Sequence, residues 1–161
     1  MRSCCLLIAL VLLPAASHAA DIASCMRALD GDSIIVEVQG HTLNVRLLGI
    51  DAPEHGQEWG EQAKAYTQRW CEGGPITLEY DLERTDRYHR TLAYAWRGSD
   101  FLNEDVVRSG LALSVYYSPN GKHLSRLKEA EAQAKTDRAG FWSGGGLAET
   151  PRKWRQEHRR E

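Results

Sequence analysis

The stretch RLLGIDAPE, residues 46–54, joins two kinds of sequence at Gly49. Before the glycine, polar and apolar side chains alternate, and such alternation is typical of a half-buried β-strand. After it, two carboxylates and a proline follow within four residues, where the strand must end. The stretch therefore predicts a strand that presents Arg46, followed by a turn that holds Asp51 and Glu54 close to that arginine.

The first 19 residues predict a secretory signal peptide. A positively charged start precedes the apolar run LLIALVLL at 6–13, and small residues then offer a cleavage site at 17–19. The run is too short to cross a bilayer. A buried core helix is a weaker interpretation because no polar face accompanies the run, and a lipoprotein anchored at Cys25 is weaker because Asp21 separates that cysteine from it. We expect cleavage near Ala19 and a secreted or periplasmic protein without membrane attachment.

Cleavage would leave two cysteines, Cys25 and Cys71. An exported chain meets an oxidising compartment, so this pair is a candidate disulfide. Two separately buried thiols are the alternative.

The charge balance argues against a protein that only coats nucleic acid. The chain has 20 Lys and Arg against 22 Asp and Glu, a net charge of −2, whereas such proteins are expected to be basic. If this protein handles phosphates, we expect it to do so at one concentrated site and with a cation.

The order of elements predicts an α+β fold built on a small antiparallel barrel. The expected strands are 33–38, 41–48, 76–80 and 91–96, and the expected helices are 58–70, 103–109 and 124–134. Residues 20–146 are expected to form one domain. The basic segment 147–161 is expected to be a disordered tail, with nonspecific contacts to nucleic acid as the alternative.

Asp32 and Asp51 are candidate ligands of a hard divalent cation. Such ions prefer oxygen ligands, often two carboxylates with a backbone carbonyl and water, and Pro53 restricts the backbone of Ala52 so that its carbonyl has a defined direction. The segment Asp30-Gly31-Asp32 does not continue as an EF-hand loop, and the six histidines have no zinc-ligand spacing. Each aspartate could instead serve a turn or a helix cap.

Two arginines complete a set suited to phosphoryl chemistry. Arg46 lies on the polar face of its expected strand, and Arg90 comes directly before another strand. Attack on a phosphodiester adds negative charge to the equatorial oxygens, and guanidinium groups with a cation stabilise that charge. Glu54 is then left to act on a water molecule. An ordinary ion pair between Arg46 and Asp51 or Glu54 is the alternative.

The same segments closely resemble the thermonuclease (staphylococcal nuclease-like) family. The resemblance rests on RLLGIDAPE, on LDGDSIIVEV before it, and on DRYHRTLAYAW and GLALSVYYSPNGKHLSRLKEAEAQAK after it, in that order. It runs from about Ala28 to Trp142. It implies a five-stranded OB-fold β-barrel with three α-helices.

The resemblance also implies roles for the site residues. Asp32 and Asp51 would ligate Ca²⁺ through carboxylates and Ala52 through its carbonyl, with Asp30 as a nearby carboxylate that is not a ligand. Glu54 would orient or deprotonate the attacking water. The scissile phosphate would be clamped by two arginines, Arg46 and Arg90.

The implied substrates are single- and double-stranded DNA and RNA, cleaved with little sequence preference to leave 3′-phosphate ends. Arg87, Tyr88 and Tyr117 match positions that line the nucleotide pocket, and a monomer is expected. Val115 stands where a tyrosine would be expected, and strand alternation predicts that Tyr116 faces away from the pocket.

The loop after Glu54 (HGQEW, residues 55–59) is shorter than in the best-known family member. A catalytically silent nucleic-acid-binding barrel is the alternative function. The key carboxylates and arginines survive in this chain, which favours the nuclease.

Overall fold

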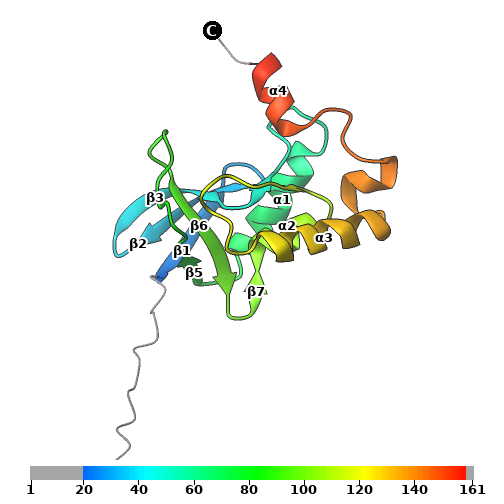
Figure 1. Ribbon diagram of the computed structural model, residues 1–161. Coiled ribbons are helices and arrows are strands. Elements are labelled where there is room, and N and C mark those ends of the chain that lie inside the picture. Colours follow the sequence, from blue (N-terminus) through cyan, green and yellow to red (C-terminus); the bar gives the residue numbers. More distant parts are fainter. Residues whose placement is uncertain (1–19, 159–161) are drawn as a thin grey trace, which may run out of the picture.

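The computed structural model describes residues 20–158, and the predicted signal peptide lies outside them. Its elements follow one another around a barrel and a group of helices (Figure 1). In chain order they are β1 (Ala20–Ala28), β2 (Ser33–Val38), β3 (His41–Leu47), β4 (Ile50–Asp51), α1 (Gly60–Cys71), β5 (Ile76–Glu79), β6 (Thr91–Arg97), β7 (Asp100–Phe101), α2 (Leu102–Arg108), β8 (Leu113–Ser114), α3 (Leu124–Thr136), the 3₁₀ helix η1 (Gly140–Gly144) and α4 (Pro151–Glu157).

Five strands close into a barrel. The sheet order is β3-β2-β1-β5-β6, extended by β7, and β3 pairs with β6 to complete the circle. The closing pair is parallel, with Val45 opposite Thr91, while the other neighbouring strands are antiparallel. Closure leaves no long open edge in this part of the sheet. The predicted α+β fold with a five-stranded OB-type barrel is therefore confirmed.

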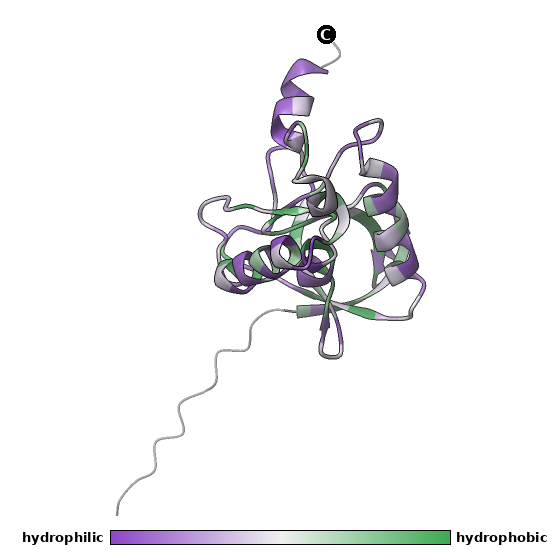
Figure 2. Cartoon of the chain, turned by 90° about the vertical axis from the view of Figure 1, so that its right-hand side faces the viewer, coloured by the Kyte–Doolittle hydropathy of each residue, from purple (hydrophilic) through white to green (hydrophobic). Residues whose placement is uncertain are grey.

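The helices differ from the expectation in number. α1, α2 and α3 lie within or close to the three predicted segments, whereas α4 is a fourth helix where a disordered tail was expected. Pro151 occupies the first turn of α4, and the hydroxyl of Thr150 accepts a hydrogen bond from the N–H of Lys153 at 3.3 Å. These are favourable start signals for a helix. The helix is hydrophilic over most of its length (Figure 2).

Asn103 on α2 fixes the end of β3 against β6. Its side-chain N–H donates to the carbonyl of Leu48 at 2.8 Å, and its side-chain oxygen accepts from the N–H of Ala95 at 3.0 Å. The side chain is fully buried and therefore needs both partners. This amide holds the backbone directly before the turn that carries Asp51.

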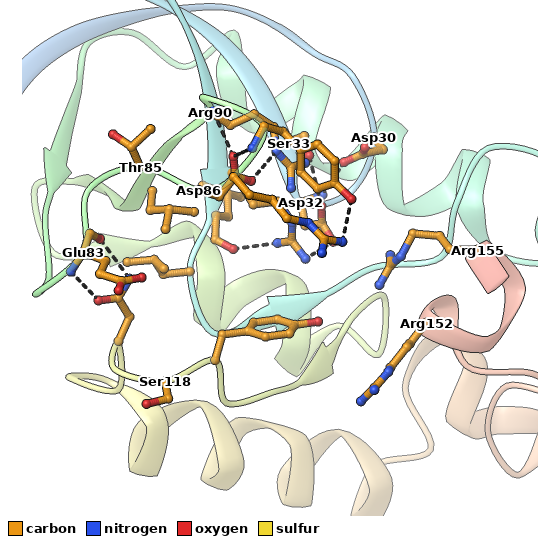
Figure 3. A pocket seen from close by; sticks show the side chains of 18 of the residues that line it. Asp30, Asp32, Ser33, Glu83, Thr85, Asp86, Arg90, Ser118, Arg152 and Arg155 are labelled. Atoms are coloured by element: carbon orange, nitrogen blue, oxygen red, sulfur yellow. Dashed lines mark hydrogen bonds and ion pairs between the residues drawn. The ribbon is translucent and has the colours of Figure 1, made fainter. Parts of the chain in front are cut away.

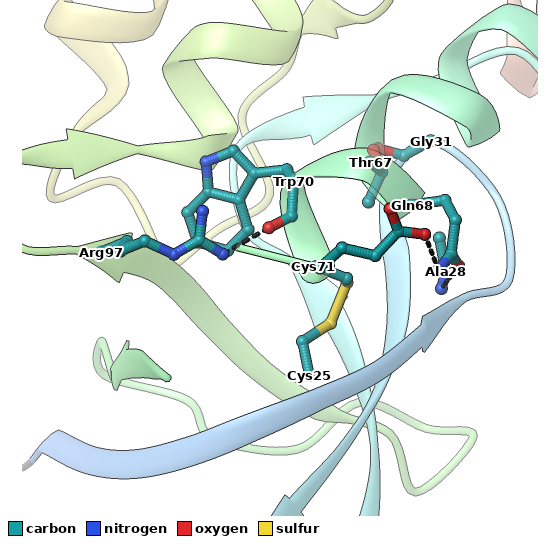
Figure 4. The surroundings of a disulfide bond; sticks show 9 residues. Cys25, Ala28, Gly31, Thr67, Gln68, Trp70, Cys71 and Arg97 are labelled. Atoms are coloured by element: carbon teal, nitrogen blue, oxygen red, sulfur yellow. Dashed lines mark hydrogen bonds between the residues drawn. A yellow bond between two sulfur atoms is a disulfide. The ribbon is translucent and has the colours of Figure 1, made fainter. Parts of the chain in front are cut away.

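A disulfide joins β1 to α1. Cys25 and Cys71 are bonded, with Cα atoms 5.1 Å apart (Figure 4). Two hydrogen bonds reinforce the same junction: the side chain of Gln68 accepts from the N–H of Ala28 at 2.9 Å, and the hydroxyl of Thr67 donates to the carbonyl of Gly31 at 2.9 Å. α1 therefore fixes the turn between β1 and β2.

In the described range 20–158, no helix has the length and apolar character needed to cross a membrane.

Candidate active site

Arg46 projects from β3 into a buried cluster of carboxylates. It is 9% exposed, and one of its terminal nitrogens, Nη1, donates to the carbonyl of Leu47 at 2.7 Å. The other, Nη2, lies 3.1 Å from Asp32 Oδ2 and 3.3 Å from Asp51 Oδ1. One guanidinium nitrogen therefore holds the carboxylates of the two predicted ligands close together. The ion pair between Arg46 and Asp51, which the sequence offered as an alternative interpretation, is present.

The turn after β3 is shaped by Gly49. Its φ is +76°, and a Cβ atom there would lie 2.4 Å from a methyl group of Leu127, so a larger residue would meet both backbone strain and a clash. The chain then enters β4, whose residue Asp51 pairs with Leu113 of β8. This short strand holds the Asp51 carboxylate in a buried position, with its side chain 3% exposed.

The turn between β1 and β2 supplies the second carboxylate. The N–H of Asp32 donates to Asp30 Oδ1 at 2.9 Å, which fixes the turn. Asp32 Oδ2 accepts from the N–H of Ala52 at 2.7 Å, and Oδ1 accepts from the hydroxyl of Ser33 at 3.1 Å. Asp32 thus contacts the backbone of the third predicted ligand, Ala52.

The crowding of carboxylates disturbs their protonation. Burial and, next, the charge of Asp32 raise the pKa of Asp30 to about 7. Burial and the charge of Asp32 also raise the pKa of Asp51, against the opposing effect of Arg155 and Arg46. A pKa is raised in this way when charged forms are desolvated and repel each other. Burial and mutual repulsion therefore make these carboxyl groups take up protons more readily than free ones, and a bound cation would oppose that effect.

Glu54 lies in a compact loop before α1. The side-chain oxygen of Gln57 accepts from the N–H of Glu54 at 3.1 Å, and the N–H of Gly60 donates to the carbonyl of Gln57 at 3.0 Å. A Cβ atom on Gly60 would lie 2.0 Å from the carbonyl oxygen of Glu54. The shortened loop is therefore closely packed, and its carboxylate borders the same cavity as Arg46.

Arg90 lies at the start of β6 and is held by Asp86. Its Nε donates to Asp86 Oδ2 at 2.8 Å, while Asp86 Oδ1 accepts from the N–H groups of Arg90 at 3.0 Å and Tyr88 at 2.8 Å. Burial alone would raise the pKa of Asp86, but the hydrogen bonds from Arg90 and Tyr88 outweigh it and lower the pKa. Asp86 had no role in the sequence prediction, although it begins the DRYHR segment.

Arg87 and Tyr88 lie on the outer side of Arg90. The guanidinium carbon of Arg87 is 4.7 Å from the centre of the Tyr88 ring, and Arg87 Nη2 donates to the Tyr88 hydroxyl at 2.6 Å. Tyr88 is 61% exposed, an unusual position for a large ring. The pair offers a cationic and aromatic surface beside the arginine.

These side chains border one cavity of about 1060 Å³ (Figure 3). Tyr117 lines it from the segment after β8, and burial together with the charge of Asp51 raises the pKa of its hydroxyl. Tyr116, which lies beyond the end of β8, is not part of the lining. Asp51 and Ala52 are buried and are not part of its lining. The predicted residues at its border are Asp30, Asp32, Arg46, Glu54, Arg87, Tyr88, Arg90 and Tyr117.

The fourth helix contributes residues that sequence reasoning missed. Arg152, Arg155 and Gln156 of α4 also line the cavity. Nη2 of Arg155 lies 2.9 Å from Asp51 Oδ1 and 3.1 Å from Oδ2, and its Nη1 pairs with Glu54. Burial would lower the pKa of Arg155, but Glu54 and Asp51 outweigh it and raise the pKa. Only the Thr-Pro pair at 150–151 hinted at this helix in the sequence.

The donor set fits a hard divalent cation through two aspartates and a backbone carbonyl, not through three or more side-chain ligands. Among residues 20–158, no group of three or more His, Cys, Asp or Glu side chains has the arrangement of a metal site. Two buried aspartates do converge on Arg46 Nη2, and oxygen ligands of this kind suit Ca²⁺ better than zinc. Four carboxyl groups (Asp30, Asp32, Asp51 and Glu54) face two guanidinium groups, those of Arg46 and Arg155, which leaves room for positive charge.

Comparison with known proteins agrees with the geometry. The sequence profile described as "Staphylococcal nuclease homologue" matches residues 44–144. The chain belongs to this family. The matched region holds Arg46, Asp51, Glu54 and Arg90, whereas α4 lies beyond its end.

Individual relatives cover most of the chain. The thermonuclease of Staphylococcus hyicus is 39% identical over 124 residues, which are 73% of this chain and 73% of that protein. The thermonuclease of Staphylococcus intermedius is 35% identical over 122 residues, or 72% and 73%. The SPbeta prophage-derived endonuclease YokF of Bacillus subtilis is 36% identical over 128 residues, which are 74% of this chain and 43% of that protein. The predicted thermonuclease-like family is confirmed.

Proposed function

We propose that the protein is a Ca²⁺-dependent endonuclease that hydrolyses phosphodiester bonds of DNA and RNA and leaves 3′-phosphate ends. Membership of the nuclease family supports the reaction class. The observation that carries the proposal is the convergence of buried Arg46, Asp32 and Asp51 beside a cavity that also holds Glu54 and Arg90. An ordinary surface ion pair does not require two buried carboxylates on one nitrogen.

The carboxylates of Asp32 and Asp51 and the carbonyl of Ala52 would hold the cation, with Asp30 close by. When bound, Ca²⁺ would supply positive charge to the phosphate and offset the surplus of carboxylates. The contact between the Ala52 N–H and Asp32 supports this assignment because it keeps two of the three ligands adjacent. The burial of both aspartates also restricts their motion.

The two arginines, Arg46 and Arg90, are held by different residues and would contact the phosphate from different sides. Arg46 is fixed by Leu47 and both aspartates, so its guanidinium needs little rearrangement when a phosphate arrives. Arg90 is fixed by Asp86 through Nε, which leaves its terminal nitrogens for the phosphate. Preorganised donors of this kind stabilise the charge that develops during attack on phosphorus. Glu54 would accept the proton of the attacking water.

Tyr88, Arg87 and Tyr117 would contact the nucleotide. Tyr88 is exposed and carries a guanidinium near its ring, and both tyrosines line the cavity. A base stacked on one aromatic ring contributes about 1–3 kcal/mol of binding free energy and tolerates any sequence. Binding through the phosphate backbone and through base stacking supports cleavage of nucleic acids with little sequence preference.

The Cys25–Cys71 bond supports export to an oxidising compartment.

Nuclease assays with Ca²⁺, with Mg²⁺ and with chelator test the proposal, and end-group analysis identifies the products. We expect chelator to abolish cleavage and Ca²⁺ to restore it. Glu54→Gln and Arg46→Ala should each lower kcat about 10²–10³-fold, as expected for single electrostatic contributors. Glu129→Gln makes the same chemical change at an exposed position of α3 and should leave the rate unchanged. Binding of oligonucleotide without cleavage would instead indicate a silent binding module.

A further inference from the structure

The C-terminal segment 149–158, here called the strap, is attached to the catalytic loop. The side-chain N–H of Gln57 donates to the carbonyl of Glu149 at 2.6 Å, and the same side chain accepts from the N–H of Glu54. Gln57 is buried, as is Pro151 at the start of α4. One amide therefore links the loop that holds Glu54 to the start of the strap.

The strap places one guanidinium on the two carboxylates that the proposed reaction needs. Arg155 Nη2 contacts both oxygens of Asp51, at 2.9 and 3.1 Å, while its Nη1 pairs with Glu54. Arg155 lines the cavity, whereas Asp51 is buried and is not part of its lining. Figure 3 shows Arg155 reaching from α4 into the cavity, with Arg152 beside it.

We infer that Arg155 is a built-in competitor of the divalent cation, and that the strap sets how readily Ca²⁺ occupies the site. The inference rests on the proposed function, because it assigns Asp51 as a cation ligand. It concerns residues beyond the end of the family match at residue 144.

Electrostatics makes the two cations exclude each other. Ca²⁺ lies about 2.3–2.6 Å from its carboxylate oxygens, and Arg155 Nη2 is already within 3.1 Å of both oxygens of Asp51. A guanidinium held across both oxygens of a buried carboxylate occupies the position of a divalent ion and would repel it strongly, since low-dielectric surroundings screen the two charges little. Arg46 differs in this respect, because it contacts only Oδ1 of Asp51, at 3.3 Å. Cation binding therefore requires Arg155 to leave Asp51, which also releases Glu54.

Covalent attachment makes the competitor effective without any added ligand. The strap is present at a high effective concentration, and the apparent Kd for Ca²⁺ equals the intrinsic Kd divided by the fraction of molecules in which the site is open. If the strap is closed in about nine molecules of ten, its release should improve the apparent Kd about tenfold.

Calorimetric titration of the purified protein with Ca²⁺ alone, without nucleic acid, tests the inference. We expect Arg155→Gln to lower the apparent Kd about tenfold. The matched control is Arg152→Gln, which removes the same charge from the same helix. Within the described chain, Arg152 makes no hydrogen bond or ion pair with Asp51 or Glu54, whereas Arg155 contacts both. The control should change Kd by about twofold or less, because exposed charges are screened by salt. Equal effects of the two variants, or weaker binding by Arg155→Gln, would overturn the inference.

A second measurement reports on the strap itself. Amide hydrogen exchange in residues 151–157 of the wild-type protein should become faster when Ca²⁺ is added, because α4 loses its contact with Asp51. Unchanged protection at saturating Ca²⁺ would contradict release of the strap.

Asp51→Asn separates failure of the inference from failure of the proposed function. If this variant loses Ca²⁺ binding while Arg155→Gln behaves like Arg152→Gln, the cation site stands and the competition does not. If Asp51→Asn binds Ca²⁺ as the wild type does, the assignment of Asp51 as a ligand is wrong and both proposals fail.

Discussion

At the scale of single residues, Asp86 lies outside the predicted set but fixes Arg90, which the proposed reaction needs. It accepts three hydrogen bonds, two of them from Arg90. We expect Asp86→Asn to loosen Arg90 and to lower kcat/KM about tenfold, because a misplaced donor stabilises the developing charge poorly. Steady-state kinetics measure this loss, and Asp137→Asn, an exposed carboxylate at the end of α3, is the control.

The difference in stability between the wild type and the same variant should depend on pH. The pKa of Asp86 is lowered in the folded protein by its hydrogen bonds, in spite of burial. Its stabilisation is therefore present above the unfolded-state pKa, near 3.9, and is lost as pH falls through the folded value. Urea unfolding should show a difference of about 2 kcal/mol between wild type and Asp86→Asn at pH 7. A difference that persists at a pH below the folded pKa would contradict this account.

The sequence predicted side chains whose partners are close along the chain or follow strand alternation. Arg46, Asp51 and Glu54 fall within nine residues of sequence, and strand alternation separated Arg46 from Val45 and Leu47, although the structure buries all three. Arg155 could not be predicted in this way, because it lies 104 residues from Asp51. Its local surroundings are basic and polar, as in many solvated tails.

At the scale of elements, the start of α1 is constrained by the loop before it. Gly60→Ala would improve helix propensity by about 1 kcal/mol if only propensity mattered. The added Cβ would however lie 2.0 Å from the carbonyl oxygen of Glu54, so we expect lower stability and at least a tenfold loss of activity as the loop shifts. Thermal unfolding and the nuclease assay measure both. Gly144→Ala is the matched control because its Cβ would have no neighbour within 4 Å, and a stabilised, fully active Gly60→Ala would contradict the packing argument.

Two of the elements that escaped prediction, β1 and α4, owe their structure to long-range contacts. In β1 the large apolar side chains Ile22 and Met26 are exposed, while small Ala23 and Ala28 face inward, so hydropathy gives no clear alternation. β1 is a strand because it pairs with neighbours on both sides, β2 and β5. α4 is short and polar, and its contacts with Gln57, Asp51 and Glu54 are long-range. In both cases tertiary pairing outweighed a weak local pattern.

At the scale of the whole molecule, the disulfide and the active site are expected to be separable. The bond closes a loop with a sequence separation of 46 residues, which by the chain-entropy relation corresponds to about 4 kcal/mol of stability. The site depends instead on noncovalent contacts: β3 with β6, Asn103 with Leu48, and Thr67 with Gly31.

The double variant Cys25→Ser/Cys71→Ser should therefore unfold at a markedly lower urea concentration, while its kcat under native conditions stays within about twofold of wild type. Reductant should shift the urea midpoint of the wild type toward that of the variant and leave the variant unchanged. Loss of activity before any loss of folded structure would show that the β1–α1 junction also positions Asp32, because Thr67 and Gln68 alone would then not hold the turn.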